Sequence, residues 1–150
     1  MRKGLVLFSS LLLTSLSVHA SNTLMIDGAY ARATPPNAPT SAVFFTAHNH
    51  SDSSIDIVSA TTPAAKIVEL HTVVMDGDVM KMRQLDALTV DASGELVLKP
   101  GSYHVMLFEL TREFVEGDDI EVTLSLSDGT TQTIVAPIKK VMAGMSHHKH

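Results

Sequence analysis

The sequence predicts an all-β fold, either a two-sheet sandwich or a Greek-key barrel. Short stretches rich in Val, Ile, Leu, Phe and Thr are separated by turn residues about every ten positions, which is typical of such folds. No window of about ten or more residues repeats apolar positions with the helical period of about 3.6. Strands of this kind bury their apolar faces most simply by packing two sheets against each other.

The expected strands are bounded by clear turn signals. Asp76-Gly77 and the stretch Ser-Asp-Gly-Thr at 127–130 favour hairpins, Glu-Gly-Asp-Asp at 116–119 favours a further turn, and the proline-rich stretch 34–40 favours a rigid loop. The predicted strands are 24–32, 42–49, 54–61, 66–75, 78–85, 95–99, 103–111, 119–127 and 130–139.

The first residues have the pattern of a secretory signal peptide. Arg2 and Lys3 precede an uncharged apolar stretch that ends near Val18, and Val18 and Ala20 supply the small residues of a cleavage site. The apolar stretch is too short for a membrane span, and no cysteine follows it as in a lipoprotein signal. We expect cleavage after Ala20, a periplasmic location, one domain over 21–141, and a flexible Met- and His-rich tail over 142–150.

Composition restricts the function. The chain carries a net charge of −5, which argues against binding to nucleic acid or to anionic lipid. It has no cysteine, so a disulfide, a thiolate ligand and a thiol nucleophile are all excluded. Its 8 methionines and 8 histidines, in a chain without tryptophan, are therefore the candidates for chemistry.

Two His–Met pairs stand out. If Asp76-Gly77 forms a two-residue type I′ turn, His71 pairs directly with Met82 across the hairpin, with Cβ atoms about 4.5–5.5 Å apart. The same register pairs Met75 with Asp78 and Val73 with Met80. His104 and Met106 are two residues apart near the start of a predicted strand, so they share one face.

Imidazole and thioether together form a soft, uncharged ligand set that favours Cu(I). Zinc sites more often take His, Cys or carboxylate. Methionine also suits an exported protein, because it cannot be lost to disulfide formation. An isolated Met or His is usually a packing or surface residue, and we assign His48 and His50 to the surface. The two pairs together indicate a metal site.

The spacing of these residues resembles that of a known family. His71, ten residues, Met82, twenty-one residues, His104, one residue and Met106 is the pattern of the periplasmic PCu(A)C copper chaperones. The stretch "AYARATPPNAPTSAVFFTAHN" (29–49) is similar to that family's N-terminal stretch, and "LKPGSYHVML" (98–107) is similar to its second metal motif. The resemblance extends from about Ile26 to Ile138.

This resemblance implies a cupredoxin-like β-sandwich, without enzymatic activity, that holds one Cu(I) through two His and two Met. It implies delivery of copper to the dinuclear centre in the copper-bearing subunit of cytochrome c oxidase, alongside a Sco-type thiol protein. We expect a monomer, with Met75 and Met80 as lining or accessory residues. Some family members carry Met- and His-rich extensions, and the tail resembles one, with candidate ligands for a second copper, Cu(I) or Cu(II), at Met142, Met145, His147, His148 and His150.

Two other functions are compatible with an exported β-sandwich. A structural or adhesive domain would bind metal only incidentally. A copper-dependent redox enzyme is the other alternative, but a blue-copper site needs a Cys thiolate, and an oxygenase with an N-terminal His needs cleavage after Val18 to expose His19.

Overall fold

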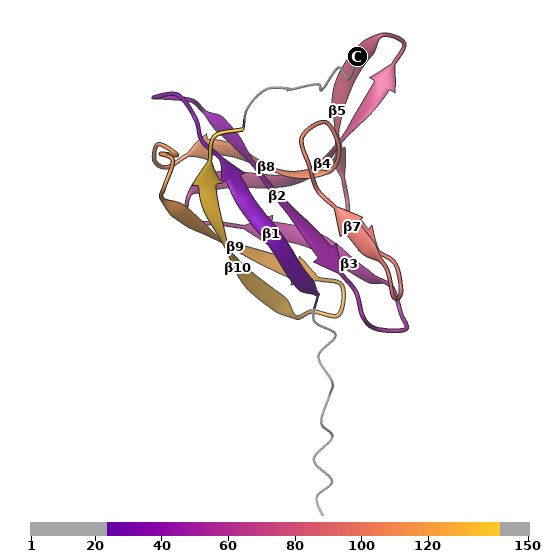
Figure 1. Ribbon diagram of the computed structural model, residues 1–150. Helices are drawn as coiled ribbons and strands as arrows, with labels where there is room; N and C mark the ends of the chain where they lie inside the picture. The colour runs from indigo at the N-terminus through magenta and orange to yellow at the C-terminus, as the bar shows by residue number, and fades with distance from the viewer. Residues whose placement is uncertain (1–23, 142–150) are drawn as a thin grey trace, which may run out of the picture.

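The structure is a computed structural model that describes residues 24–141 (Figure 1). These residues form ten strands and no helix. The strands are β1 (Met25–Arg32), β2 (Thr40–His48), β3 (Ile55–Thr61), β4 (Ala65–Asp76), β5 (Val79–Leu85), β6 (Leu88–Val90), β7 (Glu95–Val97), β8 (His104–Leu110), β9 (Asp119–Leu126) and β10 (Thr131–Lys139).

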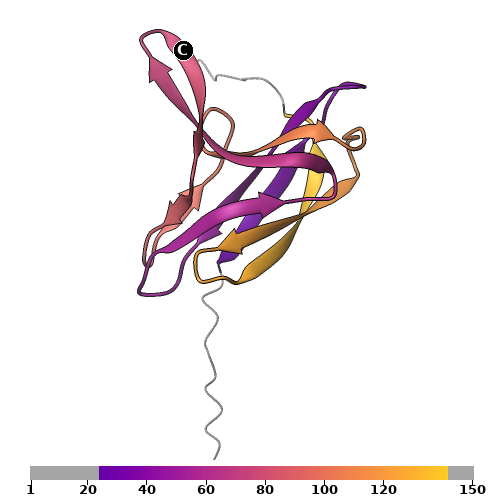
Figure 2. The same ribbon diagram turned by 180° about the vertical axis from the view of Figure 1, so that it is seen from behind.

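The strands form two layers that are joined along one side. Their hydrogen-bonded order is β5-β4-β8-β2-β1-β10-β9-β3-β6, with β7 paired to the end of β2. All pairs are antiparallel except β1 with β10, where the hydrogen-bonded sheet continues from one layer into the other. Figures 1 and 2 show β1, β2 and β8 in one layer and β9, β10 and β3 in the other.

The core lies between the layers and follows the alternation of the strands. In β9 every second residue from Ile120 to Leu126 is buried, and its partners in β10 alternate in the same way. Phe45 and Phe114 are the largest side chains of the cluster, and each is at most 2% exposed. A strand that buries one face in this way leaves its other face open for a site.

The all-β sandwich predicted from the sequence is confirmed. Each predicted strand is present to within a few residues, and the proline-rich loop ends where β2 begins at Thr40. The prediction missed β6, a three-residue strand that pairs with β3. Both the predicted signal peptide and the predicted tail lie outside residues 24–141. Within the described part, no helix is long and apolar enough to span a membrane.

The predicted register of the β4–β5 hairpin is wrong by two residues. The turn consists of Gly77 and Asp78, so Met75 pairs with Met80, Val73 with Met82, and His71 with Gln84. A type I′ turn at Asp76-Gly77 needs positive φ at both residues, but only Gly77 has it, at +63°. Gly77 at the first turn position with positive φ fits a type II′ turn instead, which moves the pairing along the hairpin.

Candidate metal site

His71 and His104 are brought together by the pairing of β4 with β8. They are direct partners in this antiparallel ladder, and their ring centroids are 5.7 Å apart. Leu70, which precedes His71, and Val105, which follows His104, both belong to the buried core. Because side chains alternate along a strand, both imidazoles belong to the outer face of the sheet. Met106, two residues beyond His104, lies on that same face.

His104 has one ring nitrogen engaged and one without a partner. Its Nδ1–H donates to the carbonyl oxygen of Ser102 at 2.9 Å, which leaves the lone pair on Nε2. Nε2 is buried and has no hydrogen-bond partner. Burial lowers the pKa of His104 below its usual value, and the nearby His71 and Arg32 act in the same direction, against the opposing effect of the Ser102 hydrogen bond. The ring is therefore neutral and able to act as a ligand at neutral pH.

His71 has the complementary arrangement. Its Nε2–H donates to a carboxylate oxygen of Glu69 at 2.7 Å, so the lone pair lies on Nδ1. Nδ1 is also buried without a partner. A carboxylate that holds one imidazole nitrogen while the other nitrogen binds a metal is a common arrangement in metal sites, because it fixes both the tautomer and the ring orientation.

The two unpaired nitrogens are the strongest chemical signal in the described part of the chain. Three buried side-chain N or O atoms lack a partner there, and two of them are His71 Nδ1 and His104 Nε2. Each buried atom of this kind costs about 1–3 kcal/mol unless something binds it. Two such lone pairs on neighbouring rings fit a bound cation.

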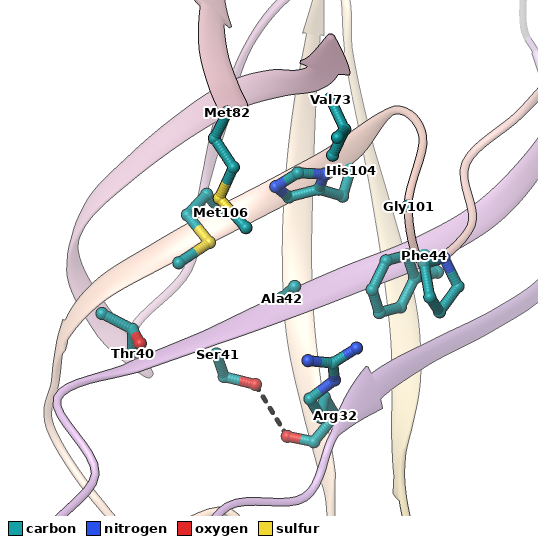
Figure 3. A pocket seen from close by; sticks show the side chains of 11 residues that line it. Arg32, Thr40, Ser41, Ala42, Phe44, Val73, Met82, Gly101, His104 and Met106 are labelled. Atoms are coloured by element: carbon teal, nitrogen blue, oxygen red, sulfur yellow. Dashed lines mark hydrogen bonds between the residues drawn. The ribbon is translucent and has the colours of Figure 1, made fainter. Parts of the chain in front are cut away.

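The thioethers of Met82 and Met106 lie beside His104 in a half-open cavity of about 120 Å³ (Figure 3). Figure 3 shows both Met side chains at the cavity, Met82 from β5 and Met106 from β8. Met82 is 61% exposed, whereas His104 is 3% exposed. The candidate ligands therefore range from a buried imidazole, His104, to a solvent-accessible thioether, Met82. The cavity is lined by Arg32, Thr40, Ser41, Ala42, Phe44, Val73, Met82, Pro100, Gly101, His104 and Met106.

The structure gathers the four predicted ligands in one region, but not through the predicted pairing. Met82, His104 and Met106 line the cavity, while His71 lies beside His104 and does not line it. Met82 faces Val73, not His71, across the hairpin. The two rings are neighbours because β4 and β8 pair, which no local sequence pattern indicates.

The other predicted residues lie elsewhere. Met75 and Met80 pair with each other further along the hairpin, outside the cavity. His48 and His50 stack nearly parallel, and His48 Nδ1 lies 3.4 Å from a carboxylate oxygen of Glu95. His50 is exposed and His48 half-buried, as expected for surface residues. The five candidate ligands of the tail are outside the described residues.

Sequence reasoning missed two charged residues at the site. Glu69 is two residues before His71, and this spacing places both side chains on one face of a strand, so the Glu-x-His pattern was an available signal. Arg32 lines the cavity from β1, with its guanidinium carbon 5.8 Å from the centre of the Phe44 ring. No local pattern places Arg32 there, because β1 reaches the site only through its pairing with β2.

Comparison with known proteins identifies the family. The profile of the LpqE-like family, a lipoprotein-type family, matches residues 24–138. This protein belongs to the LpqE-like family, which is the PCuAC family. Among curated relatives, Lxx21020 of Leifsonia xyli subsp. xyli (strain CTCB07), which is named as a lipoprotein, is 31% identical over 72% of this chain and 66% of its own length. The chain therefore spans just under two thirds of that relative.

Solved structures of PCuAC domains share the fold. The Cu(I)-bound protein DR1885 from Deinococcus radiodurans is 36% identical, with a TM-score of 0.63 over 75% of this chain and 76% of that one. The copper-bound PCuAC domain from PmoF2 has a TM-score of 0.68 over 79% of this chain and 93% of that one. Its identity is 18%, so that likeness concerns the fold alone.

Proposed function

We propose that this PCuAC protein is an exported copper chaperone that binds one Cu(I) at the cavity. The ligands would be Nδ1 of His71, Nε2 of His104 and the thioether sulfurs of Met82 and Met106. The observation that carries the proposal is the pair of buried, unpartnered imidazole nitrogens, beside a cavity that the two thioethers line. The copper-bound state of the related DR1885 supports the same metal.

The chemistry of the ligand set favours Cu(I) over other common ions. All four ligands are uncharged, and thioethers bind soft cations, so a monovalent soft ion suits them best. Zn(II) gains less, because it prefers carboxylate, thiolate or several imidazoles. Arg32 lines the same cavity, and its positive charge opposes a divalent ion more strongly than a monovalent one.

Release is as important to a chaperone as binding. Met82 lies on β5 of the β4–β5 hairpin and is largely exposed, so a partner can replace this thioether first. The imidazoles are buried and held by Glu69 and Ser102, so they leave last. A ligand set graded in this way suits stepwise transfer of the ion.

The recipient that we propose is the dinuclear copper centre of cytochrome c oxidase, with a Sco-type thiol protein as a partner. The ligand spacing in the sequence and the family membership support this assignment. It is tested by mixing Cu(I)-loaded protein with the soluble copper-bearing domain of the oxidase, with and without the thiol protein, and recording formation of the centre spectroscopically. No transfer in either mixture would remove this recipient.

Export to the periplasm is part of the proposal. The charged start and the apolar stretch to Val18 support it, and the lipoprotein names in the family are consistent with export. This chain has no cysteine to carry a lipid, so we propose a soluble periplasmic form that begins after Ala20. Mass spectrometry of the protein from the periplasmic fraction gives the N-terminus directly.

The decisive experiment is a Cu(I) titration of the protein in competition with a Cu(I) chelator of known affinity. We expect one tight Cu(I) that is lost in His104→Gln and strongly weakened in Met106→Leu. Met25→Leu, at an exposed position of β1 away from the cavity, is the matched control and should bind normally. Equal binding by the protein and by His104→Gln would exclude this site and favour a structural role for the sandwich.

A further inference from the structure

The β4–β5 hairpin extends beyond the sandwich and carries exposed methionines. β4 pairs with β8 only as far as His71, and from Thr72 onward its partner in the described residues is β5 alone. Figures 1 and 2 show this hairpin projecting from the body. Met75 is 63% exposed and Met80 is 60% exposed, nearly the same as the proposed ligand Met82.

The register places these thioethers in a row. Met75 and Met80 are direct partners, as are Val73 and Met82 one step closer to the sandwich. Residues two apart on a strand share a face and lie about 6.6 Å apart, and direct partners have Cβ atoms about 4.5–5.5 Å apart. Met75 and Met80 therefore lie on the same hairpin face as Met82 and His71, further from the sandwich.

Packing does not account for this row. A single exposed apolar side chain is ordinary and needs no explanation. Here, however, two paired thioethers and then a third follow one another along one face, which ends at the cavity. Two methionine side chains are long enough to place both sulfurs on one ion from directly paired positions. Thioether donors select Cu(I) among the common biological metal ions.

We propose that Met75 and Met80 form a capture site that takes up Cu(I) at the hairpin and passes it through Met82 to the inner ligands. This inference rests on the proposed function of the cavity. In each step one uncharged donor, a thioether or an unprotonated imidazole nitrogen, replaces another on the ion, so the copper stays Cu(I) and no proton or electron is exchanged. A two-thioether site binds more weakly than the inner site because it lacks the imidazoles. The ion therefore moves inward during loading. During transfer it moves outward along the same row only when an acceptor that binds Cu(I) more tightly takes it up.

The test compares rates with affinities in the double variant Met75→Leu/Met80→Leu. Leucine keeps the apolar surface and removes the sulfur, so a surface that merely docks a protein partner is preserved. Met25→Leu is the control, because Met25 is also exposed but lies on β1. Stopped-flow mixing with a Cu(I) complex of a small chelator measures loading and unloading. Competition at equilibrium measures the affinity of the inner site, and circular dichroism verifies the fold.

We expect the double variant to load and unload Cu(I) about tenfold more slowly, which corresponds to about 1.4 kcal/mol in activation free energy. The inner-site affinity should stay unchanged. Ag(I), a substitute for Cu(I) that is not readily oxidised, should shift the methyl NMR signals of Met75 and Met80 when added beyond the amount that fills the inner site, and should leave Met25 unaffected.

The outcomes of these experiments distinguish a failure of the capture site from a failure of the proposed function. Unchanged rates in a double variant that still binds Cu(I) tightly would overturn the capture site and leave the proposed function intact. Slower transfer only to a protein acceptor, with normal exchange to the small chelator, would also overturn it, because the two sulfurs would then act in contact with the acceptor and not in capture. Failure of the unmodified protein to bind Cu(I) at equilibrium would remove the proposed function, and the capture site with it.

Discussion

His71 and His104 lie side by side across the β4–β8 ladder, with their ring planes tilted by 52° and one buried, unpartnered nitrogen on each. The opposite nitrogens are held by Glu69 and by the Ser102 carbonyl. Both rings are thereby fixed in orientation before any ion arrives. A site arranged in this way loses little conformational entropy on binding, because the donors need not be reordered.

The first prediction concerns the pH dependence of stability without metal. Burial lowers the pKa of His104 in the folded protein, while the unfolded chain titrates near the usual value of about 6.5. Above that pH both states are neutral at this ring and the stability is fully present. As the pH falls below about 6.5, the unfolded chain takes up the proton first, so the free energy of unfolding decreases until the pH reaches the folded pKa.

Thermal unfolding of the metal-free protein between neutral and mildly acidic pH measures this effect. In His104→Gln the titrating ring is gone, so the decrease in the midpoint over that range should be smaller. An identical decrease in both proteins would contradict the assignment of a buried, neutral His104.

The second prediction concerns Glu69, which we identify as a positioning residue. Its carboxylate accepts the Nε2–H hydrogen bond of His71 and fixes Nδ1 as the donor atom. Loss of such a partner typically weakens metal binding about 10–100-fold, so we expect a loss of that size in Glu69→Ala. Glu69→Gln keeps an acceptor oxygen and should fall in between. Chelator competition measures the affinities.

The matched control for Glu69 is Glu116→Ala, which removes an exposed carboxylate that pairs with Lys140 away from the cavity. It should leave Cu(I) affinity unchanged. A drop in Glu116→Ala as large as that in Glu69→Ala would mean that overall charge, not ring orientation, controls binding.

The sequence could predict those features of the site that depend on residues close together in the chain, but not those that depend on distant strands. Alternation along a strand correctly placed His104 and Met106 on one face, because that relation lies within two residues. The neighbour of His71, in contrast, depends on which strand lies beside β4. That partner is β8, and His104 on it comes more than thirty residues after His71 in the chain. The turn at Pro100-Gly101 and the packing of the core bring β8 beside β4.

The error in the hairpin register has a local cause. A dipeptide such as Asp76-Gly77 is compatible with more than one turn, and the conformation of Gly77 decided between them. The resulting shift of two residues kept every side chain on its predicted face, since the period of a strand is two. It changed the partners, and thereby placed Met75 opposite Met80. The short strand β6 was missed, whereas the equally short β7 lies within a longer predicted stretch, 95–99.

The third prediction concerns metal selection. Met82 is exposed, so Met82→His changes a ligand without disturbing the core. A third imidazole in the set should raise the affinity for Zn(II) and lower that for Cu(I), because imidazole suits zinc and thioether does not. The unmodified protein should bind Cu(I) far more tightly than Zn(II). Tighter Zn(II) than Cu(I) binding by the unmodified protein, measured against chelators, would refute the assignment.

The fourth prediction is that the metal-free protein is folded and that Cu(I) stabilises it. The core of the sandwich is continuous without any metal ligand in it, unlike a small domain that folds only when metal binds. Free Cu(I) at 100 times the dissociation constant should add about 2.7 kcal/mol to the free energy of unfolding. Thermal unfolding measures this shift, and His104→Gln should show none. Absence of β-sheet circular dichroism in the metal-free protein would count against this prediction.

The last prediction concerns residues 142–150, whose Met and His side chains we propose as ligands of a second copper. Imidazole binds Cu(II) as well as Cu(I), whereas thioether favours Cu(I), so this segment can take up either state. Replacing His147, His148 and His150 with Gln and both tail methionines with Leu should lower the copper stoichiometry and leave the inner Cu(I) affinity nearly unchanged.

The pH dependence separates the two sites further. The tail imidazoles bind metal only when neutral, so Cu(II) uptake by the tail should weaken as the pH falls through about 6.5. The inner site should resist acid better, because its thioethers do not titrate and the pKa of His104 is lowered by burial. Cu(II) binding by the unmodified and tail-substituted proteins at neutral and mildly acidic pH measures this difference. Equal stoichiometry in the two proteins at neutral pH would exclude a second copper site in the tail.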